Sequence, residues 1–256
     1  MPYLDRDGVR LYYEVAGSGP AILLTHGFAA SSRMFAKTVP PLAIDHTVIT
    51  WDMRGHGQTD YPEDTAEYTV PLVMGDMAAL LDEAGADRGV ILGHSVGGYL
   101  ALEFNLAFPE RVDALVLEDT GPGYRKDEGR EGWNAMAESY AVEFEEKDLD
   151  GIHDSEELDP SVHRDATGLI KAARGILKQY DSRVISSLES ITVPVLIVVG
   201  EQDENFVNPS KYMAAKIPGA RLEIVPDAGH SPNMAQPEVF DAALRSFLAD
   251  LPRGVK

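Results

Sequence analysis

Short apolar segments of strand length recur along the chain. Five of them are largely apolar throughout, at 21–25, 47–51, 89–92, 114–117 and 195–199. A strand covered on both faces reads as a continuous apolar run, whereas a half-solvated strand alternates. We therefore expect buried strands at these places, and a further strand at 222–225. The segment 10–15 alternates weakly and is predicted to be an edge strand.

Segments with helical spacing lie between these strands. In 70–84 the apolar residues fall on one helical face, and 237–248 has the same pattern after Pro237. A short helix is predicted at 31–39. Strands that alternate with helices indicate an α/β domain whose mostly parallel sheet is wound on both faces. Right-handed crossovers then bring the loops that follow the strands to one edge of the sheet.

The interval 121–190 breaks this alternation. It contains no convincing strand, and its first half is rich in acidic residues. We interpret it as a helical cap inserted between two parts of one core, at 1–120 and 191–256. The apolar stripes of a cap are more often packing than pocket lining. The candidate substrate-binding residues at this side are Trp133, Met136, Tyr140 and Phe206.

The overall charge is strongly acidic. The 256 residues include 22 Lys and Arg against 42 Asp and Glu, a net charge of −20, which disfavours nucleic acid and anionic membranes as partners. The chain has no cysteine, so disulfides and thiolate chemistry are excluded. The first residues show no basic segment followed by an apolar run, and no apolar run is long enough to span a bilayer. We expect a cytoplasmic protein whose partner is a small-molecule substrate, of undetermined oligomeric state.

Candidate chemistry is concentrated after the strand at 89–92. The sequence continues Gly93-His94-Ser95-Val96-Gly97 and then takes helical spacing. Ser95 is thus expected at the tip of a sharp strand-to-helix turn, where a Cβ at Gly93 or Gly97 would crowd the junction. The Val96 amide, at the start of the helix, lacks an intrahelical acceptor and favours a developing anion.

This pentapeptide resembles the G-x-S-x-G turn of the α/β-hydrolase superfamily. His26-Gly27-Phe28 resembles the H-G-x loop of that family, and 52–57 resembles its D-x-R-G-x-G signature. The resemblance covers the whole chain and implies an α/β-hydrolase fold with a cap. It also implies a Ser-His-Asp triad in which the serine forms an acyl-enzyme, with no metal or organic cofactor.

A serine hydroxyl needs a base, and histidine has a suitable pKa. Among seven histidines, His230 follows the last predicted strand and should lie at the same edge as Ser95. Asp203, after the strand at 195–199, resembles the usual acid position of the family, and the order Ser, Asp, His agrees with it. Asp119, after the strand at 114–117, is the rival for the acid.

The remaining family positions receive supporting roles. Phe28 and Val96 are predicted to supply the two amides of an oxyanion hole. Asp52 and Arg54 are expected to brace a loop rather than take part in chemistry. His94, beside the serine, is also expected to give support only.

The most general reading is a serine hydrolase of small neutral carboxylic esters. An enol-lactonase or a carbon–carbon bond hydrolase of the same fold is the alternative, because these activities share one triad. The alternative from another class is a ligand-binding receptor that retains the triad. Ser95 argues against epoxide and halide chemistry, since relatives with those activities carry aspartate at this position.

Overall fold

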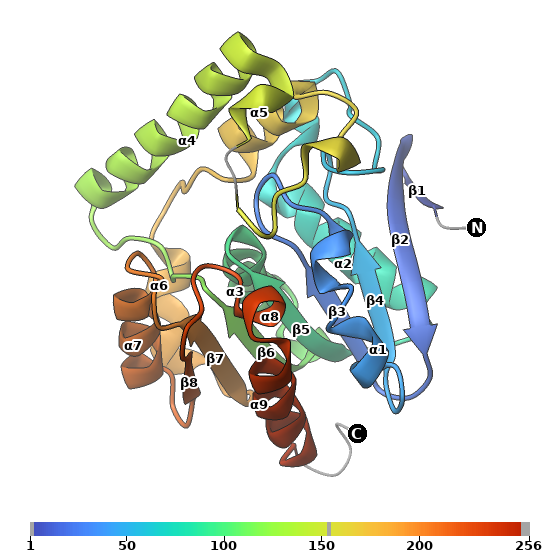
Figure 1. Ribbon diagram of the computed structural model, residues 1–256, viewed down its shortest axis with the longest axis vertical. Coiled ribbons are helices and arrows are strands. Elements are labelled where there is room, and N and C mark those ends of the chain that lie inside the picture. Colours follow the sequence, from blue (N-terminus) through green and yellow to red (C-terminus); the bar gives the residue numbers. More distant parts are fainter. Residues whose placement is uncertain (1–2, 153–154, 252–256) are drawn as a thin grey trace.

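The computed structural model contains one eight-stranded sheet, and it describes residues 3–152 and 155–251. The strands lie in the order β1-β2-β4-β3-β5-β6-β7-β8, and all pairs from β4 to β8 are parallel. β1 and β2 are antiparallel to their neighbours. Helices lie on both faces of this sheet (Figure 1). The predicted α/β class with a mostly parallel, doubly wound sheet is confirmed.

The strands coincide closely with the apolar runs. Their bounds are β1 Tyr3–Arg6, β2 Val9–Gly17, β3 Ala21–Thr25, β4 Thr47–Trp51, β5 Gly89–His94, β6 Val112–Glu118, β7 Val195–Gly200 and β8 Arg221–Val225. Every residue of β3, β5, β6 and β7 is buried, as expected for strands covered on both faces. The expectation that 10–15 forms the edge was wrong. β2 lies between β1 and β4, because 3–6 adds a short strand outside it.

The described helices form two layers and a third group beyond the sheet edge. Their bounds are α1 Val39–Leu42, α2 Val70–Glu83, α3 Val96–Ala107, α4 Asp127–Lys147, α5 Thr167–Gly175, α6 Arg183–Ser187, α7 Val207–Lys216, α8 Pro232–Ala235 and α9 Pro237–Ala249. None of them is long and apolar enough to cross a membrane.

Alternate side chains of each strand point into the two core layers, one on each face of the sheet. Leu23 and Ile91 pack with α2 and α3 on one face, whereas Leu24 and Leu92 pack with α9 on the other. The period of two residues in a strand produces this division. Apolar side chains on both faces therefore fix how far each strand extends along the sheet. This position sets the place where the following loop begins.

Two helical segments differ from the sequence prediction. The helix expected at 31–39 is instead a 3-10 turn at Ser32–Phe35 and the four-residue α1, which contains two prolines. Proline lacks the amide hydrogen that a longer helix would need. α7 was not predicted, because its sequence has little amphipathic contrast and contains Pro209.

The segment 121–190 contributes α4, α5 and α6, and no strand in its described part. α4 and α5 lie beyond the sheet edge at which the parallel strands end (Figure 1). Phe144 of α4 and Leu169 of α5 form a small core with Ala29, which belongs to the loop after β3. The division of the chain into a core and a cap remains a prediction, but these contacts anchor the helices to that loop.

Buried histidines join the same parts of the chain. His163 donates from Nε2 to the Ala29 carbonyl oxygen (2.9 Å) and accepts at Nδ1 from the Gly57 amide (3.1 Å). Its ring packs against His56, which in turn packs against His26. Burial lowers the pKa of all three, that of His26 to about 4, so they are neutral at pH 7.

Two carboxyl groups at the end of β6 are buried, and no lysine or arginine of the described residues compensates their charge. Burial raises the pKa of Glu118 to about 8 and that of Asp119 to about 10, with the neighbouring carboxylates adding to the effect. Both groups are therefore protonated in the folded protein at neutral pH. In the unfolded chain both groups are ionised at this pH, since the ordinary pKa is 4.5 for Glu118 and 3.8 for Asp119.

A pH series tests this assignment. The stability from these two groups is present below their unfolded pKa values and is lost as the pH rises through about 8 and about 10. Above pH 7 the buried His26, His56, His94 and His163 are neutral in both states, so we expect the free energy of unfolding in urea to fall by roughly 1–3 kcal/mol per pH unit. Glu118→Gln should make the fall between pH 7 and 8 shallower, and the remainder should come from Asp119. A stability that stays constant from pH 7 to 9 would contradict the assignment.

A glycine pair tests the packing of the β5–α3 junction. A Cβ on Gly97 would collide with the backbone carbonyl of Thr25, which cannot move without displacing β3, whereas a Cβ on Gly132 in α4 meets nothing within 4 Å. We expect Gly97→Ala to lose about 3 kcal/mol of unfolding free energy, and Gly132→Ala to gain up to about 1 kcal/mol. Equal effects of the two substitutions in urea unfolding would show that the junction is not tightly packed.

Candidate active site

Ser95 occupies the turn between β5 and α3. Its backbone has φ 53° and ψ −119°, a conformation that non-glycine residues rarely adopt. The Ser95 amide donates to the Glu118 carbonyl oxygen (2.9 Å), and the Thr120 hydroxyl donates to the Ser95 carbonyl oxygen (2.6 Å). Ser95 is partly exposed, although residues 89–94 and 96–104 are buried. The turn therefore holds one hydroxyl outward from an otherwise buried segment.

The glycines beside Ser95 have the predicted steric role. A Cβ on Gly93 would collide with the backbone of Gly97, and a Cβ on Gly97 would collide with that of Thr25. Strand and helix thus approach each other more closely than any larger residue permits.

His230 and Asp203 are hydrogen-bonded to each other. Nδ1 of His230 lies 2.6 Å from Oδ2 of Asp203, so the proton sits on Nδ1 and the lone pair of Nε2 is free to act as a base. Side-chain exposure is 30% for the histidine and 4% for the aspartate. Burial alone would raise the pKa of Asp203, but its hydrogen bond and charge interaction with His230 outweigh burial and hold the pKa below its usual value.

His94 connects this pair to the serine turn. It immediately precedes Ser95, its Nε2 donates to the His230 carbonyl oxygen (2.6 Å), and the two rings are 4.7 Å apart. Burial, with the nearby His230, lowers the pKa of His94 to about 3, so its ring is neutral. His94 therefore fixes the backbone of the loop that carries His230.

Within the described residues, Ser95 and His230 form no hydrogen bond with each other. They belong to adjacent segments, because His94 touches the His230 loop directly. Hydrogen bonds between a nucleophile and its base are often long in unliganded enzymes and shorten when substrate binds. The arrangement brings all three predicted triad residues to one edge of the sheet, after β5, β7 and β8.

Two backbone amides near Ser95 are without acceptors. Within the described ranges, neither Phe28 nor Val96 donates its amide hydrogen to any group. An ideal Cβ on Gly27 would be 3.3 Å from Cβ of Ser95, which places the loop before Phe28 against the serine. His26 holds that loop, since its Nε2 accepts from the Met53 amide (3.0 Å) and its Nδ1 donates to the Gly27 carbonyl oxygen (2.7 Å). Such amides can stabilise an oxyanion.

The loop after β4 is held by hydrogen bonds and an ion pair, none of which involves the triad. Asp52 accepts from the amides of Ser32 (2.7 Å) and Gln58 (2.8 Å). The buried Arg54 binds Asp76 through two hydrogen bonds, of 2.6 and 2.9 Å. These contacts agree with the structural role expected for Asp52 and Arg54.

The four candidate pocket residues fall into two groups. Phe206 stacks on His230 (5.1 Å between ring centroids), and Tyr140 stacks on Phe28 (6.0 Å), so both contact residues of the site. Trp133 instead donates from Nε1 to the Leu177 carbonyl oxygen (2.8 Å), which ties α4 to the chain after α5. Met136 is half-buried in α4 and has no described contact with the triad.

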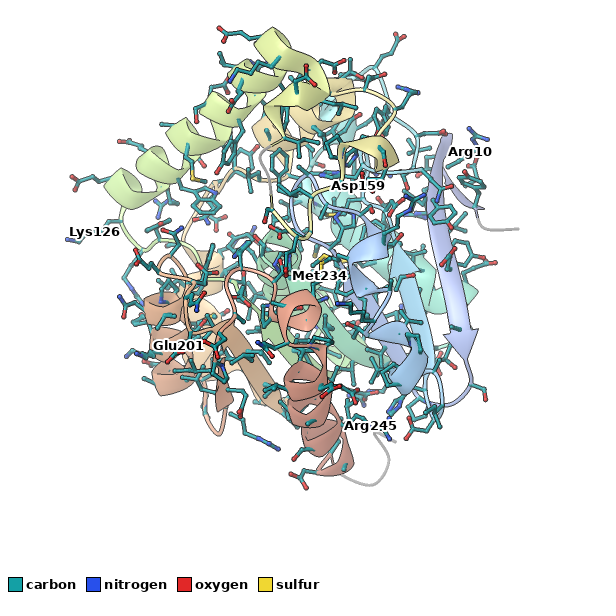
Figure 2. All side chains as sticks on the ribbon, in the orientation of Figure 1. Arg10, Lys126, Asp159, Glu201, Met234 and Arg245 are labelled. Carbon is teal, nitrogen blue, oxygen red and sulfur yellow. The ribbon has the colours of Figure 1, made fainter. Side chains whose placement is uncertain are left out.

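Glu157 reaches the site and was missed by sequence reasoning. It lies between α4 and α5, two residues before Asp159, which Figure 2 labels together with Met234 of α8. Its Oε2 accepts from the hydroxyls of Ser231 (2.7 Å) and Ser155 (2.5 Å). Burial would raise the pKa of Glu157, but the hydrogen bonds from these hydroxyls outweigh burial and hold the pKa below its usual value. Glu157 is one of many acidic residues in this part of the sequence, so no local pattern distinguishes it as a site residue.

Asp119 also lies at the site. Atoms of Asp119, Asp203 and His230 lie within 4.8 Å of one another, a spacing that could suit a metal ion. However, Nδ1 of His230 and Oδ2 of Asp203 are already bonded to each other. These residues therefore form a hydrogen-bonded cluster rather than a set of free ligands.

Comparisons with known proteins agree with this architecture. A curated protein of Bacillus subtilis, named as a putative 2-succinyl-6-hydroxy-2,4-cyclohexadiene-1-carboxylate synthase, is 30% identical over 96% of this chain and 97% of its own length. The structure of a thermophilic esterase from Thermogutta terrifontis matches with a TM-score of 0.80 and 26% identity, covering 98% of this chain and 97% of that one. An esterase from Exiguobacterium antarcticum matches with a TM-score of 0.78 and 26% identity, covering 95% and 97%.

The family model described as "Alpha/beta hydrolase family" matches residues 22–243, which is most of the chain and includes the segments that carry Ser95, Asp203 and His230. The sequence resemblance, the sheet order and the structural neighbours lead to the same assignment: this chain belongs to the alpha/beta hydrolase family.

Proposed function

We propose that the protein hydrolyses small neutral carboxylic esters through an acyl-enzyme formed on Ser95. The observation that carries this proposal is the 2.6 Å hydrogen bond between His230 and Asp203, at the edge where Ser95 is held outward. It leaves one imidazole nitrogen free as a base. The esterases of similar structure support the choice of ester chemistry.

Acylation would use three groups. As the Ser95 oxygen attacks the ester carbonyl, its proton passes to Nε2 of His230, and the carbonyl oxygen becomes an oxyanion facing the amides of Phe28 and Val96. The bond to the leaving alkoxide then breaks, and His230 returns the proton to that oxygen. Asp203 remains ionised and stabilises the imidazolium.

Deacylation would repeat these steps with water. His230 removes a proton from a water molecule that attacks the acyl-enzyme, and the Ser95 oxygen leaves with that proton. The products are the carboxylic acid and free Ser95, so the cycle needs no cofactor.

The charges around the site favour a neutral substrate. Within the described residues, no lysine or arginine forms an ion pair or hydrogen bond with the triad, whereas Glu157 lies beside His94. An anionic substrate would meet this carboxylate without a compensating cation. Lactone hydrolysis and carbon–carbon bond hydrolysis are the alternatives, because the same triad serves them.

A second candidate is a synthase of the kind named for the Bacillus subtilis relative, since the two chains align over nearly their full lengths. That name describes a compound with a carboxylate group and a succinyl group. The absence of triad-linked cations in the described residues places this candidate second.

Turnover of a chromogenic ester tests the proposed function. We expect many equivalents of product per protein from a short-chain neutral ester, and labelling of Ser95 by a covalent serine probe. Lactones, vinylogous diketones and acyl-CoA esters should give lower kcat/KM. Release of a single equivalent would indicate a receptor instead, and a preference for acyl-CoA esters would contradict the charge argument.

Substitutions at the triad provide the matched control. Ser95→Ala and His230→Ala should each lower kcat by about 10⁵-fold or more with little change in unfolding free energy, because the groups act as one unit. The double variant should be no worse than either single variant. Losses that multiply in the double variant would show that the two residues act independently.

The choice of acid has its own test. Asp203→Asn should lower kcat/KM by roughly 10³-fold or more, because asparagine cannot stabilise the imidazolium. Asp119→Asn should lose much less, since Asp119 makes no hydrogen bond to His230. The reverse ranking in steady-state kinetics would make Asp119 the acid.

A further inference from the structure

Asp119 is a buried acid without an obvious structural purpose. It follows β6, is fully buried, and has φ 40°, a left-handed conformation that is strained for a non-glycine residue. Its Oδ1 accepts from the Gly200 amide (3.0 Å). Its Oδ2 is buried and, within the described residues, has no donor.

The neighbour of this carboxyl group is Asp203. Atoms of the two side chains lie within 4.8 Å of each other and of the His230 ring. Two carboxylates at such a distance in a buried site cannot both be ionised, because their repulsion is not screened by water. One of the two carboxyl groups, Asp119 or Asp203, must therefore be protonated.

The donors around each acid decide which one holds the proton. Asp203 accepts from the amides of Asn205 (3.2 Å) and Phe206 (3.3 Å) at Oδ1, and from His230 at Oδ2. Three N–H groups thus stabilise its charge, whereas a single amide faces Asp119. Hydrogen bonds to the charged form favour ionisation, so Asp203 is the carboxylate.

We propose that Asp119 is a positioning residue of the triad, whose protonated carboxyl group donates a hydrogen bond from Oδ2 to Asp203. This proposal rests on the proposed function and deepens it. The bond gives the orphaned Oδ2 a partner, and it orients the Asp203 carboxylate toward Nδ1 of His230. Because the donor is neutral, the triad retains a single negative charge beside the imidazole.

The other charged groups agree with this arrangement. Asp203 lies beside Asp119 and disfavours its ionisation, and Glu118, the preceding residue, does so as well once it is itself ionised above neutral pH. Burial has the same effect and is larger. The His230 ring packs against the neutral His94, and Glu157, on the segment between α4 and α5, lies near His94 and binds the Ser231 hydroxyl.

The experiment compares Asp119→Asn and Asp119→Ala with Asp113→Asn as the control. Asparagine keeps an acceptor for the Gly200 amide and a neutral donor for Asp203, whereas alanine removes both. Asp113 is a buried acid paired with Arg88 at the opposite end of β6, roughly 20 Å away. We expect Asp119→Ala to lower kcat/KM by about 10-fold or more, and Asp119→Asn to restore most of that loss.

Two measurements do not depend on turnover, so they separate this proposal from the proposed function. The infrared difference between the unmodified protein and Asp119→Asn at neutral pH should contain the band of a protonated carboxyl group. The pH midpoint of the His230 ring, followed by NMR, should move by less than about 0.3 in Asp119→Asn, as in Asp113→Asn, because no charge is removed.

The opposite results would overturn the proposal. If Asp119 were ionised, the infrared difference would show carboxylate bands, and loss of its charge within 4.8 Å would lower the His230 midpoint by about one unit or more. An Asp119→Asn variant as impaired as Asp119→Ala would also contradict the role of a neutral donor. Inactivity of the unmodified protein toward every ester, with the infrared and NMR results as expected, would reject only the proposed function.

Discussion

Parallel pairing of β3, β5, β6, β7 and β8 is the constraint on which the site depends. Apolar side chains on both faces fix the position of each strand along the sheet, so the loops after the strands begin at a common edge. Residues more than a hundred positions apart therefore become neighbours, as in the 2.6 Å bond from His94 to the His230 carbonyl oxygen. The reactive groups need no long-range contacts of their own to meet, because the core has already aligned the segments that carry them. This arrangement requires local backbone strain, which is seen as positive φ at Ser95 and Asp119.

Burial also decides the charges at that edge. His26, His94 and His163 are kept neutral, and Glu118 and Asp119 are kept protonated, so these five groups carry no charge at pH 7. Asp203 and Glu157 have lowered pKa values and are ionised, and each accepts several hydrogen bonds. A carboxylate in such a place acts strongly on an imidazole, because few other charges compete with it. The chain thus combines a net charge of −20 with a site where ionisation is tightly limited.

The sequence predicts most of the sheet and the segments that make up the site, because both depend on local patterns. Continuous apolar runs locate β3 to β7, and Gly93 and Gly97 mark the tight turn around Ser95. It does not predict features that depend on tertiary contacts. β1 is too short and polar to be recognised before β2 offers it a partner, and Glu157 is one acid among many until Ser231 meets it. The same holds for Trp133 and Tyr140, which share one helical stripe although only Tyr140 packs on Phe28.

The contacts of the 121–190 segment connect its position with the chemistry proposed for the edge. Ala29, one residue after Phe28, is buried by Phe144 and Leu169, and its carbonyl oxygen accepts from His163. On the other side, Glu157 binds the hydroxyl of Ser231, the residue after His230. The segment therefore holds both the loop with the Phe28 amide and the loop with the proposed base. A shift of these helices would move the two loops together, so the geometry around Ser95 depends on how the segment packs as much as on the sheet beneath it.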